Sequence, residues 1–238
     1  MKRVILDRMK ALVLSSGGID STTCLAMAVK KLGAKNVSAL SIFYGQRHER
    51  ELQSSIAVAE FYNVARYELD AAAIFKHSNS ALLNTSTQML DKSSYAAQIN
   101  KNRSPRIATY VPFRNGLMLS MAASFADSIY ENKYIELYIG VHADDASTGF
   151  AYADCRGDFI AAMSAAIRIG TYEKIKLVAP FLCQKKSDVV KAGLELGVPY
   201  HLTWSCYEGG DTPCGKCATC IDRANAFAAN GIKDPALA

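Results

Sequence analysis

Apolar and polar positions along the chain fall into blocks that predict strands separated by helices. Short apolar runs predict strands at 11–14, 37–44, 66–69, 134–141 and 176–179. Apolar residues at helical spacing predict helices at 22–32, 49–62, 115–130, 158–169 and 186–196. Strands that alternate with helices are typical of βαβ units, so we expect an α/β fold in which a parallel sheet is flanked by helices on both faces.

Residues 71–112 interrupt this alternation. The segment is polar, rich in Ser, Asn and Lys, and has no strong period. A stretch of that length predicts a lid, an insertion or a partly disordered loop. Its cations are either simply solvated or part of a mobile cover over an anionic ligand; they are Lys92, Lys101, Arg103 and Arg106.

The turn after the first predicted strand reads S-G-G-I-D-S over residues 16–21. Gly17 and Gly18 allow positive φ and remove the Cβ atoms that would keep a phosphate away. Asp20 and Ser21 are good N-cap residues, so the unpaired N–H groups of the next helix would face the same point. The turn therefore predicts a phosphate or pyrophosphate site, with an ordinary Ser/Gly turn as the alternative. No G-x-x-x-x-G-K-[ST] motif is present, and the pattern instead resembles the pyrophosphate loop of ATP pyrophosphatases.

Four of the seven cysteines gather near the C-terminus, and their number and spacing suit a tetrahedral Zn²⁺ site. Gly215 lets the chain turn between two of them, and the last two fit the first turn of a helix over 221–230. An odd cysteine count without a signal peptide disfavours a disulfide framework. An iron–sulfur cluster is the main rival, and we favour structural zinc because four thiolates close the shell. The predicted ligands are Cys206, Cys214, Cys217 and Cys220.

Composition places the chain among globular proteins, with 238 residues, 50% of them hydrophobic and 21% charged. No apolar run reaches membrane-spanning length, and residues 1–8 carry charge where a signal peptide needs its apolar region. We therefore expect a cytoplasmic protein. The net charge of +5 suits an anionic substrate such as ATP, but it is too small to indicate a nucleic-acid surface.

Polar side chains come directly after several of the predicted strands. In parallel sheets, ligands bind beyond these carboxyl ends of the strands. Because the carboxyl ends of parallel strands share one edge, we expect these residues to lie together. They are residues 44–49, Arg114, Asn115, His142, Asp144, Asp145, residues 154–156 and Lys186.

Further motifs stand in a fixed order around the two described above: Y-G-Q-R-H at 44–48, V-P-F-R-N at 111–115, D-C-R at 154–156 and T-W-S-C-Y at 203–207. With these motifs the chain resembles the 7-cyano-7-deazaguanine synthase family from about Lys10 to Pro235. It departs from the family at two positions. Ala153 stands where the family usually has Pro, and Phe113 stands where it has Gly, next to Arg114.

The resemblance implies an adenine nucleotide alpha-hydrolase-like, Rossmann-like fold and a role in queuosine precursor biosynthesis. The implied reaction converts 7-carboxy-7-deazaguanine and ammonia into the nitrile by adenylating first the carboxylate and then the amide. Each round would turn ATP into AMP and pyrophosphate, with Mg²⁺ at the phosphates. We expect small-molecule partners, no nucleic acid, no membrane, and a homodimer, the commonest oligomer.

Carried over residue by residue, the resemblance places Asp20 near Mg²⁺. It makes Arg114, Asp154 and Arg156 candidates for substrate contacts and Lys186 a candidate for neutralising charge in the transition state. No residue is identified as a general base, and Cys155 is interpreted as a small buried thiol. The implied ATP site comprises Ser15, Ser16, Gly17, Gly18, Ile19, Asp20, Ser21, Thr22, Thr23, Cys24 and Leu25.

The expected organisation is an ATP-binding domain at 1–200, with the insertion at about 71–112, and a zinc-binding region at 201–238 packed on it. Two other function classes stay open. A tRNA-modifying adenylase or thiolase with the same loop would need an RNA-binding domain or a large basic face. A non-enzymatic zinc-knuckle module would leave residues 16–21 unexplained.

Overall fold

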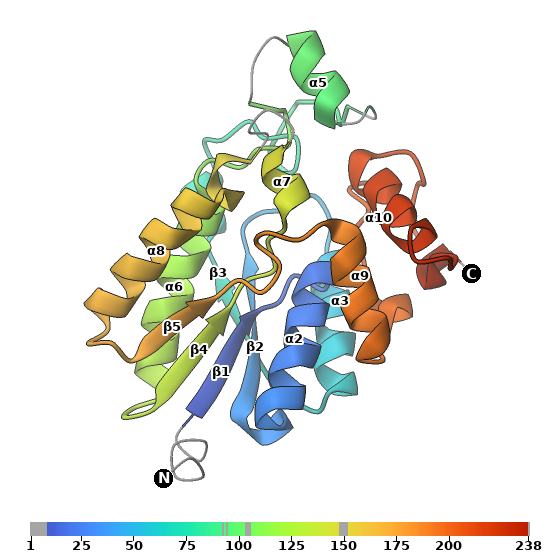
Figure 1. Cartoon of the computed structure of the whole chain (residues 1–238). Coiled ribbons are helices and arrows are strands. Elements are labelled where there is room, and N and C mark those ends of the chain that lie inside the picture. The colour runs from blue at the N-terminus through green and yellow to red at the C-terminus, as the bar shows by residue number, and fades with distance from the viewer. Residues whose placement is uncertain (1–8, 92, 94, 103–105, 148–151, 238) are drawn as a thin grey trace.

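The computed structural model describes residues 9–91, 93, 95–102, 106–147 and 152–237. In these residues, five parallel strands form one sheet in the spatial order β3-β2-β1-β4-β5 (Figure 1). The strands are β1 (Met9–Leu14), β2 (Val37–Phe43), β3 (Ala65–Asp70), β4 (Tyr134–Tyr138) and β5 (Ile175–Val178). The parallel sheet predicted from the alternating pattern is confirmed.

Strand β1 lies at the centre of the sheet because its middle residues are apolar on both faces. Ala11, Leu12 and Val13 have no exposed surface, whereas the edge strand β3 has no fully buried residue. The chain runs outward from β1 through β2 to β3 and then returns to place β4 on the other side of β1. This reversal of strand order creates a crevice at the carboxyl end of β1, where open parallel sheets bind their ligands.

Helices cover both faces of the sheet, as predicted (Figure 1). One core lies under α6 (Arg114–Ile129) and α8 (Gly157–Gly170), and it includes Leu12. The opposite core lies under α2 (Ile19–Leu32), α3 (Arg50–Phe61), α9 (Lys186–Glu195) and α10 (Ala218–Ala228). The shorter elements are α4 (Ala72–Phe75), α5 (Tyr95–Asn102), α7 (Ala143–Ser147), η1 (Ala34–Asn36), η2 (Ala153–Cys155), η3 (Tyr200–Leu202) and η4 (Pro235–Leu237). None of the described helices has the length and apolar character needed to cross a membrane.

Helix α2 begins earlier than the sequence pattern predicts. Gly18 is its N-cap residue, in an extended conformation, so Asp20 and Ser21 lie within the first turn and the prediction of a cap at these two residues was wrong. The Ser21 hydroxyl instead folds back, donating to the Gly18 carbonyl over 3.3 Å and lying 3.2 Å from the Ser16 hydroxyl. Glycine is one of the residues favoured at N-cap positions, and Gly18 makes no side-chain cap of its own.

The 71–112 segment is anchored at its middle, which the expectation of a polar lid did not foresee. Ala81, Leu82 and Leu83 are at most 7% exposed and pack in the core, and two backbone hydrogen bonds join this stretch to the loop after β2. Arg47 N donates to the Leu82 carbonyl over 3.0 Å, and Asn84 N donates to the Gly45 carbonyl over 2.8 Å. Lys92 and Arg103 lie outside the described residues, so their predicted roles stay expectations.

A buried ion pair ties α10 to the residues that follow it. The Arg223 guanidinium donates to both carboxylate oxygens of Asp234, over 2.6 and 2.8 Å, and each side chain is only 4% exposed. The same guanidinium donates to the carbonyls of Tyr200 and Thr203, over 3.1 and 3.3 Å. The pair thereby links α10, η3 and the C-terminal turn, which lie far apart in sequence.

We predict that Asp234→Asn lowers the free energy of unfolding by about 3 kcal/mol or more, because it leaves the Arg223 charge buried without its carboxylate. The matched control is Asp211→Asn, since Asp211 pairs with Arg50 at 2.7 Å but is fully exposed. That change should leave the free energy of unfolding nearly unchanged, because water screens an exposed pair. Urea unfolding of the two variants measures both values, and equal losses would contradict the prediction.

Candidate active site

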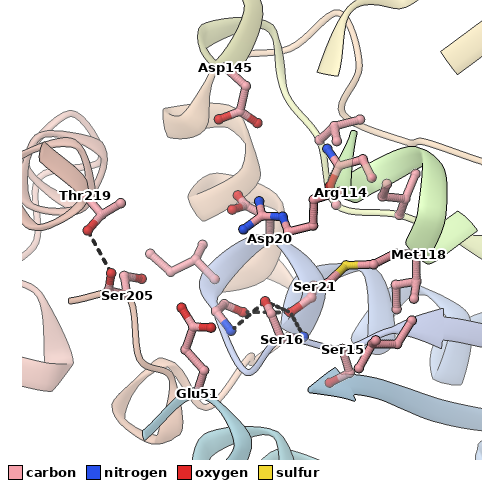
Figure 2. A pocket seen from close by; sticks show the side chains of 18 of the residues that line it. Ser15, Ser16, Asp20, Ser21, Glu51, Arg114, Met118, Asp145, Ser205 and Thr219 are labelled. Carbon is pink, nitrogen blue, oxygen red and sulfur yellow. Dashed lines mark hydrogen bonds between the residues drawn. The ribbon is translucent and has the colours of Figure 1, made fainter. Parts of the chain in front are cut away.

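A cavity of about 260 Å³ opens at the carboxyl edge of the sheet, beside the point where the strand order reverses. Its walls come from the loops after β1, β2 and β4, from the first turns of α2, α3, α6 and α9, and from the C-terminal region (Figure 2). The expectation that polar side chains from several strand ends meet at one edge is therefore confirmed for Tyr44, Arg114, His142, Asp145 and Lys186.

The loop between β1 and α2 is held close to α3, and Gly17 makes this approach possible. Gly17 has φ of +77°, and a Cβ atom at this position would lie 2.4 Å from the Glu51 carbonyl oxygen and 2.6 Å from Ser55 N. Close contact with α3 is therefore one requirement for this glycine, and the positive φ that the sequence predicts is confirmed. The expectation that the glycine leaves room for a phosphate stays a prediction. Gly18 differs, because it lines the cavity and its Cβ would meet only Ser16 Oγ at 3.4 Å and the Trp204 carbonyl oxygen at 3.5 Å.

The predicted ATP segment divides into a part that lines the cavity and a part that is buried in the core. The lining part is Ser15, Ser16, Gly18, Ile19, Asp20 and Ser21. The remainder beyond Ser21 faces the protein interior: Thr22, Thr23, Cys24 and Leu25 have no exposed surface. Only the first turn of a helix offers unpaired N–H groups to a ligand, so the chemistry of this segment ends at about Ser21.

Asp20 and Lys186 form an ion pair at the centre of the site. Burial would raise the pKa of the Asp20 carboxyl, but the Lys186 ammonium and His142 outweigh it and hold the pKa below its ordinary value. The other carboxylate oxygen, Oδ1, is buried and has no hydrogen-bond partner among the described residues. His142 Nε2 lies 3.9 Å from this oxygen, which is too far for a hydrogen bond, so the oxygen can still accept a cation.

Two more carboxylates stand around this pair. Asp145 Oδ1 lies 3.4 Å from His142 Nε2, and Asp222 of α10 lines the same cavity. Burial raises the pKa of both carboxyls. Carboxylate oxygens are the protein ligands that Mg²⁺ prefers, so the unpartnered Asp20 oxygen and Asp145 fit the expected Mg²⁺ in their chemistry.

Arg114 enters the cavity from the first turn of α6. Its guanidinium lies 5.3 Å from the centroid of the Tyr44 ring, and Nη1 donates to the Tyr44 hydroxyl over 3.4 Å. No carboxylate pairs with it among the described residues. The backbone turn before it is left-handed at Phe113, with φ of +52°, where the family's glycine would be unstrained. The Phe113 ring occupies the space that a Cβ at Gly116 would fill, at 2.3 Å.

The structure does not bring Asp154 and Arg156 into the cavity lining. Asp154 is buried, and its Oδ2 accepts a hydrogen bond of 2.9 Å from Asn115 N, so it holds the start of α6 in place. Arg156 is only partly exposed and donates to both oxygens of Asp158, over 2.9 and 2.7 Å. Of the predicted reaction residues, Asp20, Arg114 and Lys186 come together, whereas Asp154 and Arg156 lie behind or outside the cavity wall.

Cys155 does line the cavity, next to these residues. It is 7% exposed, and its sulfur accepts a hydrogen bond of 3.2 Å from Asn115 Nδ2. Burial raises the pKa of the Cys155 thiol well above its ordinary value, so the neutral thiol dominates at neutral pH. This agrees with its interpretation as a small buried thiol rather than a nucleophile.

Sequence reasoning missed two charged residues of the cavity lining, Glu51 and Asp222. Glu51 lies in the first turn of the helix after β2, so the rule that ligands meet the ends of strands could have included it. Asp222 follows no strand, and its position depends on how α10 packs against α9. The described cations of the 71–112 segment lie elsewhere: Lys101 pairs with Asp91, and Arg106 stacks on Tyr110.

The four C-terminal cysteines gather as the spacing predicts. Their sulfur atoms all lie within 4.8 Å of one another, and sulfurs around a tetrahedral Zn²⁺ are about 3.8 Å apart for Zn–S bonds of about 2.3 Å. Gly215 has φ of +67°, Cys217 is the N-cap of α10, and Cys220 lies in its first turn. Backbone N–H groups also point at the sulfurs, from Cys214 to Cys206 at 3.3 Å and from Cys217 to Cys214 at 3.3 Å. The cluster could therefore hold a metal ion.

The cysteine cluster is connected directly to the loop after β1. Trp204 N donates to the Gly17 carbonyl over 2.9 Å, and the Trp204 indole N–H donates to the Cys206 carbonyl over 2.7 Å. Ser205 and Thr219 join through a hydrogen bond of 2.7 Å and line the cavity beside them (Figure 2). The C-terminal region thus completes the site as one of its walls.

Comparison with known proteins places this architecture in a family. The family model described as queuosine biosynthesis protein QueC matches residues 10–231. A curated protein of Archaeoglobus fulgidus is 40% identical over 96% of this chain and 90% of its own length, and one of Thermoplasma volcanium is 42% identical over 95% and 89%. A protein of Pseudoalteromonas atlantica is 40% identical over 95% and 97%. All three are named 7-cyano-7-deazaguanine synthase, and this chain belongs to the QueC family of queuosine biosynthesis proteins.

Proposed function

We propose that the protein is an ATP-dependent synthase that converts 7-carboxy-7-deazaguanine and ammonia into 7-cyano-7-deazaguanine. The observation that carries the proposal is that one cavity holds both the loop after β1 and a cation, Arg114, that forms no ion pair within 4.0 Å among the described residues, although the charges of Asp154 and Glu51 act on it from farther away. The loop supplies N–H groups for a polyphosphate, and Arg114 supplies a partner for a substrate carboxylate. A homodimer acting in the cytoplasm completes the proposal.

The chemistry needs two activations because a carboxylate and an amide both lack a good leaving group. The substrate carboxylate attacks the α-phosphorus of ATP, releasing pyrophosphate and forming an acyl adenylate. Ammonia displaces AMP to give the amide. The amide oxygen then attacks the α-phosphorus of a second ATP, which releases pyrophosphate and, with loss of one N–H proton, forms an adenylated imidate. Loss of AMP and the remaining N–H proton from this intermediate leaves the nitrile.

We assign each step to residues according to their place in the cavity. Arg114 orients the carboxylate, and the first turn of α2 with Lys186 stabilises the negative charge of the departing pyrophosphate. Asp20 and Asp145 would hold Mg²⁺, which neutralises phosphate charge when bound. Asp154 acts through Arg114, because it positions the start of α6. Arg156 keeps its proposed contact with substrate only if it leaves Asp158.

The activity itself is the first prediction. With ATP, Mg²⁺, ammonium and 7-carboxy-7-deazaguanine, the protein should form the nitrile by way of the amide, and it should form AMP and pyrophosphate but no ADP. The proposed chemistry requires two ATP per nitrile, and one ATP without ammonium when the amide is supplied directly. Mass spectrometry of the products measures each quantity. Formation of ADP, or absence of both amide and nitrile from folded protein, would overturn the proposal.

The second prediction separates the two loop glycines. Gly18→Ala should keep the thermal stability and lower ATP–pyrophosphate exchange about 100-fold, because Gly18 lines the cavity and an added methyl group would meet only Ser16 Oγ and the Trp204 carbonyl oxygen at ordinary distances. Gly17→Ala should instead lower stability by about 1–3 kcal/mol or more, because its Cβ meets the backbone of α3 at a positive φ. Gly33→Ala is the control, since Gly33 has the same φ of +77° and nothing within 4 Å. A Gly17 variant as stable as the Gly33 variant, or a fully active Gly18 variant, would show that the loop is misinterpreted.

The third prediction concerns the metal, which we propose is one structural zinc ion per chain. Cys206→Ser should lose the metal together with soluble, folded protein, because four thiolates form a closed shell around the ion. Cys183→Ser is the control, because Cys183 is an exposed free cysteine outside the cluster. Elemental analysis of the purified proteins gives the stoichiometry. Visible absorbance typical of an iron–sulfur cluster, or a metal-free folded chain, would contradict zinc.

A further inference from the structure

Glu51 is a cavity residue that the reaction scheme above leaves without a role. It lies in the first turn of α3, and its carboxylate faces the cavity (Figure 2). The side chain is half-buried, and among the residues that the structure describes it has no hydrogen bond and no ion pair. Burial raises the pKa of the Glu51 carboxyl, and the charge of Arg114 only partly opposes this. A carboxylate in such a place costs free energy unless a ligand supplies hydrogen-bond donors.

Arg114 stands in the same cavity with the opposite charge and the same lack of an ionic partner among the described residues. The other charged groups at the centre are already engaged: Lys186 pairs with Asp20, and Asp145 lies against His142. The charge of Glu51 raises the pKa of the Tyr44 hydroxyl, and Arg114 offsets only part of the cost of burying Glu51. Glu51 is not among the groups that shift the pKa of Asp20. Asp222 also forms no ion pair within 4.0 Å among the described residues, but its charge acts with Lys186, His142 and Asp145, so Glu51 is the unpaired carboxylate nearest in charge to Arg114. The Arg114 side of the cavity therefore offers a cation and a carboxylate to a ligand that carries an acid group and two adjacent donors.

A 7-carboxylated deazaguanine has this combination of groups. Its carboxylate lies on the five-membered ring, and the opposite edge of the six-membered ring presents the N1–H and 2-amino donors side by side. Two adjacent donors match the two oxygens of a carboxylate, and such charge-assisted pairs are strong and directional. Aromatic side chains, including Tyr44 and Trp204, line the same cavity and suit a flat ring.

We propose that the Glu51 carboxylate accepts hydrogen bonds from the N1–H and 2-amino groups of the substrate. Glu51 would thereby select a 2-amino-4-oxo ring. Arg114 takes the substrate carboxylate at the other end, so the two residues together fix the orientation in which the carboxylate meets ATP. This inference rests on the proposed function, because it assigns a role within the same site. It makes Glu51 a specificity residue that contacts the substrate, while the adenylation chemistry stays with the α2 loop and Lys186.

The test compares two ligands and three proteins. Isothermal titration without ATP or ammonium measures the affinity of 7-carboxy-7-deazaguanine and of its analogue that lacks the 2-amino group. The proteins are the wild type, Glu51→Gln and Glu60→Gln. Glu60 is the matched control because it lies on the same helix and is exposed. Thermal unfolding and metal content show that each variant is folded, and Glu51→Asp is measured as well in case Glu51→Gln is not.

The wild type should prefer the 2-amino ligand by about 10- to 100-fold, the range for one bidentate pair. Glu51→Gln should lose most of that preference, because its side-chain NH₂ group would face one of the two N–H donors of the substrate. Its affinity for the analogue should change little. Glu51→Asp, whose carboxylate is shorter by one methylene, should also lose preference. Glu60→Gln should match the wild type for both ligands.

Three results would overturn the inference. The first is a wild type that binds both ligands equally, and the second is a Glu51 variant that loses the same factor for both. The third is unchanged binding together with a raised KM for ammonium, which would make Glu51 an ammonia site. Failure of the proposed function is distinguishable from these outcomes, because the wild type would then bind neither ligand and form no amide.

Discussion

The backbone of residues 15–18 is held on three sides, and the rest of the site is arranged around that constraint. Ser15 N donates to the Leu40 carbonyl of β2 over 2.8 Å, Gly17 lies against the first turn of α3, and the Gly17 carbonyl accepts a hydrogen bond from Trp204 N. The Ser15 hydroxyl lies 3.0 Å from that of Ser55, which joins the loop to α3 a second time. A loop fixed in this way presents its N–H groups in one direction without reorganisation, which is what electrostatic stabilisation of a polyphosphate requires.

The same constraint gives the cysteine cluster a role beyond stabilising the C-terminus. The Trp204 backbone and indole N–H groups connect the loop to Cys206, and the buried Arg223–Asp234 pair anchors α10 from its other side. Residues of this region, including Ser205 and Asp222, then line the cavity. A metal bound to the four thiolates would therefore support the site through the backbone while staying outside the chemistry.

The charged residues of the cavity fall into two groups, one around Asp20 and one made of Arg114 and Glu51. In the proposed reaction the first group serves ATP and the second serves the other substrate. Around Asp20 the Lys186 ammonium pairs with one carboxylate, and Asp145 and Asp222 add further negative charge beside the Asp20 oxygen that suits a cation. Arg114 and Glu51 instead lack ionic partners among the described residues. Charges held apart in a partly desolvated site are unfavourable without ligand, and they become favourable when a ligand of complementary charge binds between them.

The sequence by itself determined the parallel α/β sheet, the loop after β1, the cysteine cluster, and the positions of Arg114 and Lys186, because these follow from local periodicity, residue type and the ends of strands. Only the tertiary structure decided that Gly17 serves contact with α3, that Asp154 and Arg156 do not line the cavity, and that Ala81–Leu83 are buried. It also decided that Glu51 and Asp222 enter the site. The physical reason is that each of these features depends on contacts between residues that are far apart in the sequence. Such contacts leave no periodicity or motif in the chain.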